Sequence, residues 1–415
     1  MYFSFFPFAS LGLKMKLKFY KNYVIGKLKE SLFASLIGVT AGLSAAFLDF
    51  LILLFHNLSF ELGIQFFHLT FLAVYMFVVA SIESSITLPG LVLSLRILRE
   101  NLFIPFFVWL IKFIGVAISL SILPLGREGP AMFLGTGLGQ YISQLLRLPK
   151  GQLNYWGTIG AVAFVGAFLK TPLGGTFYVL ENRFGKVLNV DFLINALTAS
   201  TVSFTIYAYL RGFHPLLHIE GHFHWNLLDL IPSVILGILT ALATVILLLL
   251  YEFFKFLARF VPENMRPLAI FPVVLLLFAI AHNHQHIHLL ELAVTYQPIN
   301  EVSSNLYPPS ELLGVIALEM VSIAIFLSFG YPGGIVLPLI FLGASLGNLV
   351  AYYSPDKLSI LALTGAAAMV SASLNIPITA VIMITEMSHQ TLIIPEIVGV
   401  LTAYFLAKAF KILRA

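Results

Sequence analysis

Apolar residues fill most of the chain in runs that short polar, glycine or proline breaks separate. A helix needs about 20 apolar residues to cross a bilayer, so the longest runs predict membrane-spanning helices. These runs lie at about 32–58, 62–82, 102–122, 190–211, 228–260, 309–328 and 391–413.

Other apolar runs are too short to cross, and glycine or proline interrupts them. The breaks fall at Pro89-Gly90, 126–130, Pro172, 332–334, Pro338 and Pro377. Backbone groups facing lipid must be hydrogen-bonded within the protein. The short runs therefore predict half-helices that meet inside the bilayer.

Two pairs of segments repeat in the same order. Residues 130–139 and 338–347 share the pattern P-x-x-F-L-G-x-x-L-G, 208 residues apart. Residues 160–181 and 365–386 share small residues, a proline and a final glutamate, 205 residues apart. Two matches at nearly one offset indicate a duplication, because chance rarely produces both.

The duplication divides the chain into four parts. We expect a basic N-terminal segment over 1–31, a first membrane repeat over 32–211, a linker over 212–227 and a second membrane repeat with the C-terminal helix over 228–415. A repeated transporter places its site where interrupted helices of both halves converge. If each half crosses the membrane an odd number of times, the halves are inverted.

Composition decides the class of protein. The 415 residues are 59% apolar and only 10% charged, with a mean hydropathy of +0.97, too few charges for a soluble surface. The sequence predicts an all-α integral membrane protein and excludes disordered proteins and nucleic-acid binders. The net charge of +4 needs no acidic partner, and the lack of cysteine excludes disulfides and thiolate sites.

Basic residues at both ends predict cytoplasmic termini in a multi-pass protein of the cell membrane. Six lysines lie within residues 14–29, after an aromatic-rich stretch, whereas a signal peptide carries its charges first. Lys408, Lys411 and Arg414 give the same prediction for the C-terminus.

The most specific segment reads Gly126-Arg127-Glu128-Gly129-Pro130 and opens the run at 129–146. Proline fits the first turn of a helix, and the unpaired N–H groups of that turn attract anions. The N–H groups of Arg127, Glu128 and Gly129 are therefore candidate anion donors, and the Glu128 carboxylate lies where an anion would bind. The alternative is that Arg127 and Glu128 pair and only cap a loop.

A second such helix start, in the other half, carries no charge. It reads from Gly333 and Gly334 through Ile335 and Val336 to Pro338. Two positive helix ends without a basic side chain form a weak anion site, which suits conduction because the ion must also leave.

These motifs resemble those of the CLC family of chloride channels and chloride/proton antiporters over about residues 32–413. The resemblance implies inverted halves, a homodimer with one pore per subunit, and no cofactor. It implies Glu128 as the gating glutamate and chloride bound by the N–H groups of Ile335 and Val336. Protonation of Glu128 would release the blocked pathway to chloride. The protein is thus expected to transport chloride or a similar anion and not to be an enzyme.

The sequence departs from the family at several positions. The family loop GSGIP falls near 85–89, where Ile86 replaces the serine, although a slip of one residue offers the Thr87 hydroxyl. The family's inner tyrosine would fall just past Ala415, and Val336 stands where the family has phenylalanine. These differences leave a mostly backbone-built central site, and a fluoride-selective variant remains an alternative.

The proton path also differs, because Asn182 occupies the inner position where antiporters of the family carry a glutamate. Asparagine does not titrate, so two modes remain open: a passive channel, or an antiporter whose protons reach Glu128 through water. Glu181 and Glu386 are interpreted as structural because the repeat preserves both, and Lys112 is interpreted as a buried structural charge.

Histidines form two clusters that are weak metal candidates. One contains His214, His218, His222 and His224, and the other contains His282, His284, His286 and His288. Such spacings occur in metal sites, which gives the alternative of a metal-dependent membrane oxidase or desaturase. Polar outer loops or an external metal or pH sensor are the other interpretations.

Overall fold

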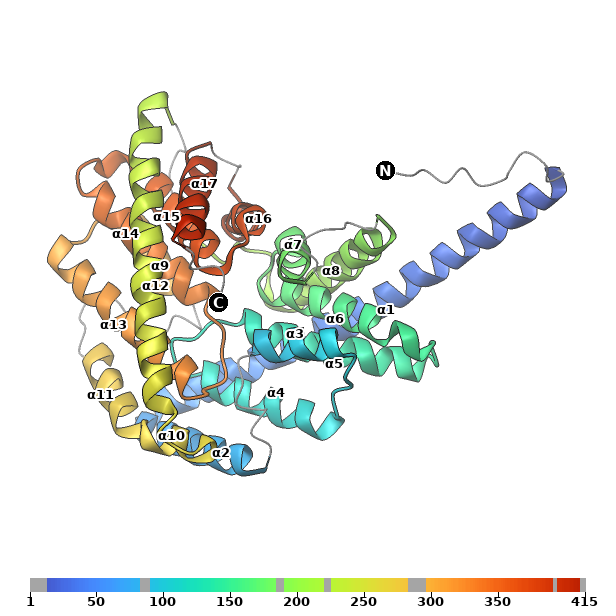
Figure 1. Ribbon diagram of the computed structural model, residues 1–415, viewed down its shortest axis with the longest axis horizontal. Coiled ribbons are helices and arrows are strands. Elements are labelled where there is room, and N and C mark those ends of the chain that lie inside the picture. The colour runs from blue at the N-terminus through green and yellow to red at the C-terminus, as the bar shows by residue number, and fades with distance from the viewer. Residues whose placement is uncertain are drawn as a thin grey trace.

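The computed structural model is built from helices (Figure 1). The residues that it describes are 13–82, 90–183, 190–219, 225–282, 296–390 and 394–410.

Among the described residues, eight α-helices form the first half of the chain. They are α1 (Leu13–Glu61), α2 (Gln65–Ile82), α3 (Gly90–Glu100), α4 (Phe106–Leu120), α5 (Glu128–Leu145), α6 (Leu153–Phe168), α7 (Pro172–Arg183) and α8 (Val190–Arg211).

The second half contains the helices from α9 onward. They are α9 (Leu230–Ala258), α10 (Arg266–Ala269), α11 (Phe271–His282), α12 (Gln297–Ser304), α13 (Pro309–Ser328), α14 (Val336–Ala351), α15 (Leu358–Leu374), α16 (Pro377–Ser388) and α17 (Ile394–Ala409). Short 3₁₀ turns lie at Lys150–Gln152, Leu227–Asp229, Glu263–Met265 and Pro355–Lys357.

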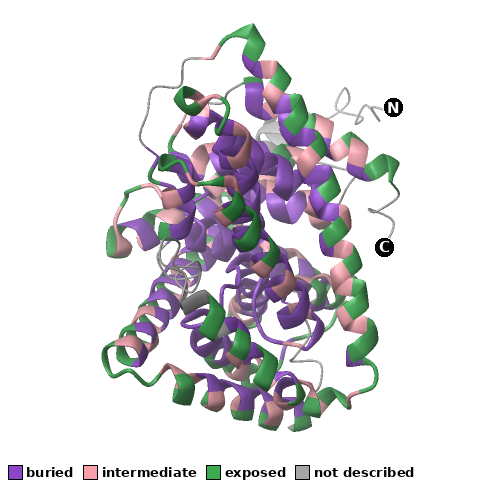
Figure 2. Cartoon of the chain, turned by 90° about the vertical axis from the view of Figure 1, so that its left-hand side faces the viewer, coloured by how far each residue is buried: buried purple, intermediate pink, exposed green. Residues whose placement is uncertain are grey.

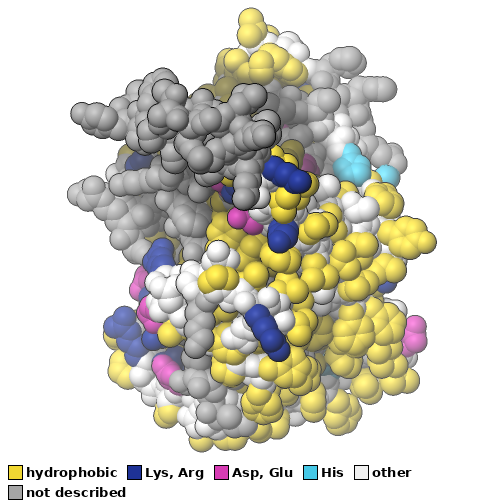
Figure 3. All heavy atoms as spheres, turned by 90° about the vertical axis from the view of Figure 1, so that its right-hand side faces the viewer, with side chains coloured by type: hydrophobic (Ala, Val, Ile, Leu, Met, Phe, Trp, Pro, Cys, Tyr) yellow, Lys and Arg dark blue, Asp and Glu magenta, His cyan; other side chains and the backbone are white. Residues whose placement is uncertain are grey.

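Five helical segments among the described residues are long and apolar enough to cross a membrane. They are Lys21–Glu61, Val190–Arg211, Leu227–Ala258, Pro309–Ser328 and Pro355–Leu374. Large hydrophobic side chains remain exposed along many helices, and they form a broad surface on the face in Figure 3. Such a surface suits lipid, which confirms the predicted all-helical membrane fold.

Three of the runs predicted to span form shorter helices. The run at 62–82 yields α2 of 18 residues, because Gly63 has a positive φ of 62° and turns the chain after α1. The run at 102–122 yields α4 of 15 residues, which begins only after the extended Pro105. The third is α17, with 16 residues.

The two halves repeat one packing pattern. In the first half α5 packs along α6, α6 packs on α8, and α1 packs on α8 and α6. In the second half α14 packs along α15, α15 on α17, and α9 on α17 and α15. Buried residues concentrate in the interior of the helical assembly (Figure 2). The packing thus repeats in the same order as the repeated sequence motifs.

Repeated glycines explain the shared sequence motif, because they let the paired helices touch. A Cβ atom on Gly135 of α5 would lie 2.3 Å from the carbonyl oxygen of Gly160 on α6. A Cβ atom on Gly343 of α14 would lie 2.2 Å from the carbonyl oxygen of Gly365 on α15. Small residues permit such close backbone approach between membrane helices.

A buried amide also recurs at equivalent positions. Gln140 on α5 accepts a hydrogen bond from the Ile104 N–H at 3.0 Å and donates to the Leu102 carbonyl at 2.8 Å. Asn348 on α14, 208 residues later, accepts from the Tyr307 N–H at 3.2 Å and donates to the Val302 carbonyl at 2.6 Å. Each amide bonds the loop that leads into α4 or α13, and Asn348 also bonds α12 through Val302, as buried polar groups require.

The first helix passes through the boundary at residue 31 without a break. It has 49 residues, and its N-terminal part extends away from the other helices (Figure 1). A helix of this length is about 73 Å long at 1.5 Å per residue, far more than a bilayer's hydrocarbon core. The basic segment is therefore continuous with the first spanning helix.

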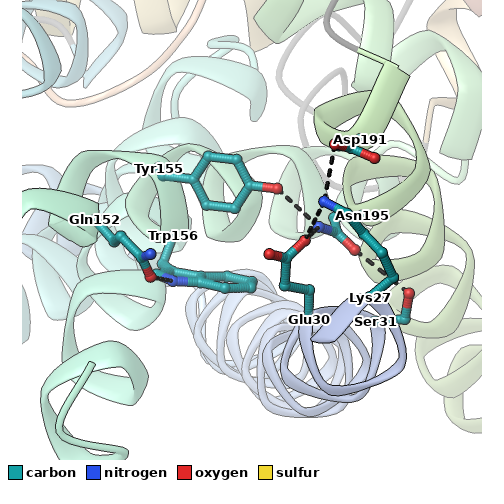
Figure 4. Close-up of polar contacts among 8 residues, drawn as sticks. All are labelled: Lys27, Glu30, Ser31, Gln152, Tyr155, Trp156, Asp191 and Asn195. Atoms are coloured by element: carbon teal, nitrogen blue, oxygen red, sulfur yellow. Dashed lines mark hydrogen bonds and ion pairs between the residues drawn. The ribbon is translucent and has the colours of Figure 1, made fainter. Parts of the chain in front are cut away.

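A polar cluster ties this helix to α6 and α8 near its N-terminal part (Figure 4). Lys27 lies 2.8 Å from Asp191 and 3.1 Å from Glu30. Asn195 of α8 donates to the Tyr155 hydroxyl of α6 at 2.7 Å. The side chains of Lys27, Glu30 and Asp191 are partly exposed, so the ion pairs contribute little to stability.

Helices α7 and α16 join the two halves through reciprocal caps. Glu386, near the end of α16, accepts from the Gly174 N–H at 2.7 Å and from the Thr171 hydroxyl at 2.6 Å. Glu181, near the end of α7, accepts from the Thr379 N–H at 2.7 Å. Each carboxylate stabilises the positive start of the other helix, which agrees with the structural interpretation of both glutamates.

Candidate functional site

The starts of α5 and α14 meet at a short backbone bridge between the two halves. The Gly126 N–H donates to the Gly334 carbonyl at 2.6 Å, and the Gly334 N–H donates to the Gly126 carbonyl at 2.6 Å. These glycines are 208 residues apart, the same offset as the repeated motif. The positive ends of two equivalent helices therefore converge, as the interrupted runs predict.

The Glu128 carboxylate occupies this convergence point. It is only 1% exposed, and its Oε1 accepts a hydrogen bond from the Val336 N–H at 2.7 Å. The N–H groups of Ile335 and of Glu128 itself also lie close enough to stabilise the charge of the carboxylate. The carboxylate is itself an anion, and it thus occupies the N–H donors that the sequence predicts for a bound anion.

Glycine makes room for this carboxylate. A Cβ atom on Gly334 would lie 2.0 Å from Glu128 Oε1, and one on Gly126 would lie 2.4 Å from Oε2. Any larger residue at either position would collide with the carboxylate. The glycines of both motifs therefore have a steric role in addition to the backbone bridge.

Arg127 does not form the predicted alternative pair with Glu128. Its guanidinium lies 2.9 Å from Asp49 Oδ1 on α1, and Asp49 Oδ2 lies 2.6 Å from Arg211 at the end of α8. The guanidinium also stacks 5.0 Å from the ring centres of Phe168 and Tyr296. Arg127 thus anchors the loop before α5, and Glu128 is left for the helix starts.

Sequence comparison places this arrangement among known proteins. The sequence model of the family described as voltage gated chloride channel matches residues 92–408. The chain belongs to the voltage-gated chloride channel family. The H(+)/Cl(-) exchange transporter ClcA of Yersinia pestis bv. Antiqua (strain Angola) is 26% identical over 315 residues. That match covers 72% of this chain and 64% of the relative's length.

Solved structures show the same fold as this voltage-gated chloride channel family member. A slow cyanobacterial Cl-/H+ antiporter matches with a TM-score of 0.78 and 18% identity, over 92% of this chain and 94% of that one. A CLC-type fluoride/proton antiporter matches with a TM-score of 0.71 and 20% identity, over 92% of this chain and 96% of that one. The resemblance read from the motifs is therefore confirmed for family and fold.

Two further positions of this chloride channel family member can be placed. Asn182 lies near the end of α7, and its side-chain amide donates to the Tyr178 carbonyl at 2.8 Å. Lys112 of α4 is 1% exposed, and its ammonium lies 5.9 Å from the Phe133 ring centre. It shares the wall of a narrow pocket with Tyr75 and Pro332, close to the second glycine motif.

Several predicted residues lie outside the described residues. These are Ile86 and Thr87 of the loop near 85–89, and His222, His224, His284, His286 and His288 of the histidine clusters. His282 ends α11, and its side chain is not described. Among the described ranges no group of three or more histidine, aspartate or glutamate side chains could hold a metal ion.

The sequence motifs predict no role for Asp49 and Tyr296, which contact Arg127, or for Arg211, which pairs with Asp49. Asp49 gave a usable signal, because a lone carboxylate in the apolar run at 32–58 is costly unless it is paired. Its partners, 78 and 162 residues away, had no local signature.

Proposed function

We propose that the protein transports chloride or a similar small anion across a membrane, with Glu128 as the gate. The observation that carries this proposal is the hydrogen bond from the Val336 N–H to the Glu128 carboxylate. A carboxylate and a chloride ion carry the same charge and bind the same donors, so they compete for the helix starts. The ClcA relative is named an exchange transporter of H⁺ and Cl⁻, which supports the same substrates here.

The electrostatics of the site suggest how the gate opens. The ionised carboxylate is attracted to two helix N-termini and occupies the anion position. A proton removes that charge and weakens the bond to the Val336 N–H, because bonds to charged groups are the stronger ones. The side chain therefore leaves most readily in its neutral form, and an anion takes its place among the N–H groups.

Asn182 determines which transport mode is available. Its amide cannot carry a proton, and in the structure it bonds the backbone of α7. Protons that reach Glu128 from the α7 end must then travel through water. If they do, anion and proton movements are coupled; if they do not, the protein is a passive anion pathway.

Reversal potentials measured on the reconstituted protein test the proposal. We expect a current across a planar bilayer that reverses at a potential set by the chloride gradient. A shift of that potential when an opposing proton gradient is imposed indicates exchange, and its absence indicates passive flow. Failure to observe any anion current from correctly folded protein would contradict the proposal.

Gly334→Ala is expected to open the gate without acid. Its Cβ would lie 2.0 Å from Glu128 Oε1, and the carboxylate must move because it is the flexible partner. Loss of the hydrogen bond from the Val336 N–H to the charged carboxylate shifts the equilibrium between blocked and open gate by about tenfold. Chloride flux from liposomes at neutral pH should therefore rise by about that factor.

Gly314→Ala is the control for this change. Gly314 lies in α13, and a Cβ atom added there would meet no atom within 4 Å. The control should transport like the unchanged protein. A folded Gly334→Ala protein with the ordinary dependence on acid would show that the carboxylate does not need its present position to block flux.

We also propose the assembly and orientation that the family resemblance implies. The protein would form a homodimer with one pathway per subunit, and both termini would lie in the cytoplasm. The relatives named above are transporters, which supports a transporter and not an enzyme. The proposed repeats over 32–211 and 228–415 agree with the repeated helix packing.

A further inference from the structure

Tyr296 combines two unfavourable features at one residue. Its φ of 58° lies in the left-handed region, which a bulky residue adopts only when its surroundings impose it. Its side chain is 4% exposed, and the hydroxyl has no hydrogen-bond partner among the described residues. A strained backbone and an unpaired buried hydroxyl together point to a functional constraint on this tyrosine.

The ring of Tyr296 is fixed beside the gate. The Arg127 guanidinium stacks on it at 5.0 Å from the ring centre, and Asp49 lies 2.9 Å from the same guanidinium. Arg127 directly precedes Glu128 in the chain. The tyrosine therefore keeps a defined position relative to the first turn of α5, and its hydroxyl interacts electrostatically with the Glu128 carboxylate.

Among the described residues, only one of the two carboxylate oxygens of Glu128 has a hydrogen-bond partner. Oε1 accepts from the Val336 N–H, whereas the buried Oε2 has no partner within the described ranges. A carboxylate oxygen accepts hydrogen bonds, and a tyrosine hydroxyl donates them. The gate and Tyr296 thus present a complementary acceptor and donor in the same buried region.

We propose that the Tyr296 hydroxyl is a second hydrogen-bond donor for the Glu128 carboxylate. The Tyr296 hydroxyl bonds the carboxylate after the carboxylate has left the Val336 N–H and an anion has replaced it at the helix starts. Tyr296 then acts as a positioning residue, because it stabilises the displaced gate while the carboxylate is still ionised. This inference rests on the function proposed above and assigns a new residue to it.

Other ionisable groups lie around the two partners. Tyr178 of α7 interacts with Glu128, and Tyr207 of α8 interacts with Asp49, Arg127 and Tyr296. Arg211 and Lys170 act on Asp49 and Arg127 and not directly on the gate. Tyr207 is buried in the same cluster without an interaction with Glu128 in the described structure, so it offers a matched control.

The test compares Tyr296→Phe and Tyr207→Phe, each with and without Glu128→Gln, by chloride efflux from liposomes across a pH series. With the natural Glu128, Tyr296→Phe should lower flux about tenfold at neutral pH, since one bond to a charged group is lost. At acid pH, where the carboxylate is protonated, the flux should be unchanged. Tyr207→Phe should keep the ordinary pH profile.

The Glu128→Gln background separates the possible outcomes. There the tyrosine has no carboxylate to receive, so Tyr296→Phe should have no effect on flux. An equal loss of flux in both backgrounds, or at every pH, would overturn the inference and assign Tyr296 to the anion or to folding. If Glu128→Gln alone leaves transport and its pH response unaltered, the proposed function itself fails.

Discussion

Replacement of Glu128 by glutamine is expected to give fast chloride efflux that no longer responds to pH. Glutamine fills the same volume but carries no charge, so it does not compete with chloride for the two helix starts. The bond from the Val336 N–H, 2.7 Å long in the structure, weakens to one between neutral groups. The unchanged protein should approach the same flux only in acid, and at neutral pH we expect it to be slower by on the order of tenfold.

Chloride efflux from liposomes between pH 4 and pH 8, values spanning the ordinary carboxyl range, measures this effect. Glu319→Gln is the matched control, because Glu319 is another buried carboxylate, 1% exposed, on α13. That variant should keep the response to acid. A Glu128→Gln protein whose efflux still rises in acid would place the titrating gate elsewhere in the chain.

Replacement of Asp49 by asparagine is expected to destabilise the protein strongly. Asp49 is bound by both Arg127 and Arg211, at 2.9 Å and 2.6 Å. Arg127 is 1% exposed, so loss of the carboxylate removes an ion-pair partner from a buried positive charge. Breaking a buried pair in this way typically costs about 3–5 kcal/mol.

Thermal unfolding in detergent, followed by tryptophan fluorescence, compares this variant with Asp191→Asn. Asp191 pairs with Lys27 at 2.8 Å, but its side chain is 43% exposed. The loss of a surface pair costs less than about 1 kcal/mol and fades at high salt. Equal stability of the two variants would mean that the Asp49 cluster does not hold the loop before α5.

Glu128, the proposed gate, and its surroundings were predictable to different extents. The offset of 208 residues, read from Pro130 and Pro338, predicts that Gly126 and Gly334 occupy equivalent places, and the structure joins them directly. The position of Glu128 followed from helix-start chemistry, which depends only on neighbouring residues. Such local rules are strong in this chain because its few charges stand out against apolar sequence.

Partners that are distant in sequence were not predictable in the same way. Nothing near Arg127 indicates that it pairs with Asp49 and stacks on Tyr296. The role of Gln140 and Asn348 was also missed, although both follow the repeated glycine motif by one residue. Their function appears only when the loops before α4 and α13 fold back onto α5 and α14.

The bridge between Gly126 and Gly334 limits how the protein can move during transport. Two hydrogen bonds of 2.6 Å fasten the halves to each other at the proposed anion site. A rocking motion of one half against the other, the usual means of alternating access in repeated transporters, would have to break both bonds in a buried region. We therefore expect turnover to proceed with the helices nearly still, its rate set by the rotation of one side chain and the arrival of a proton.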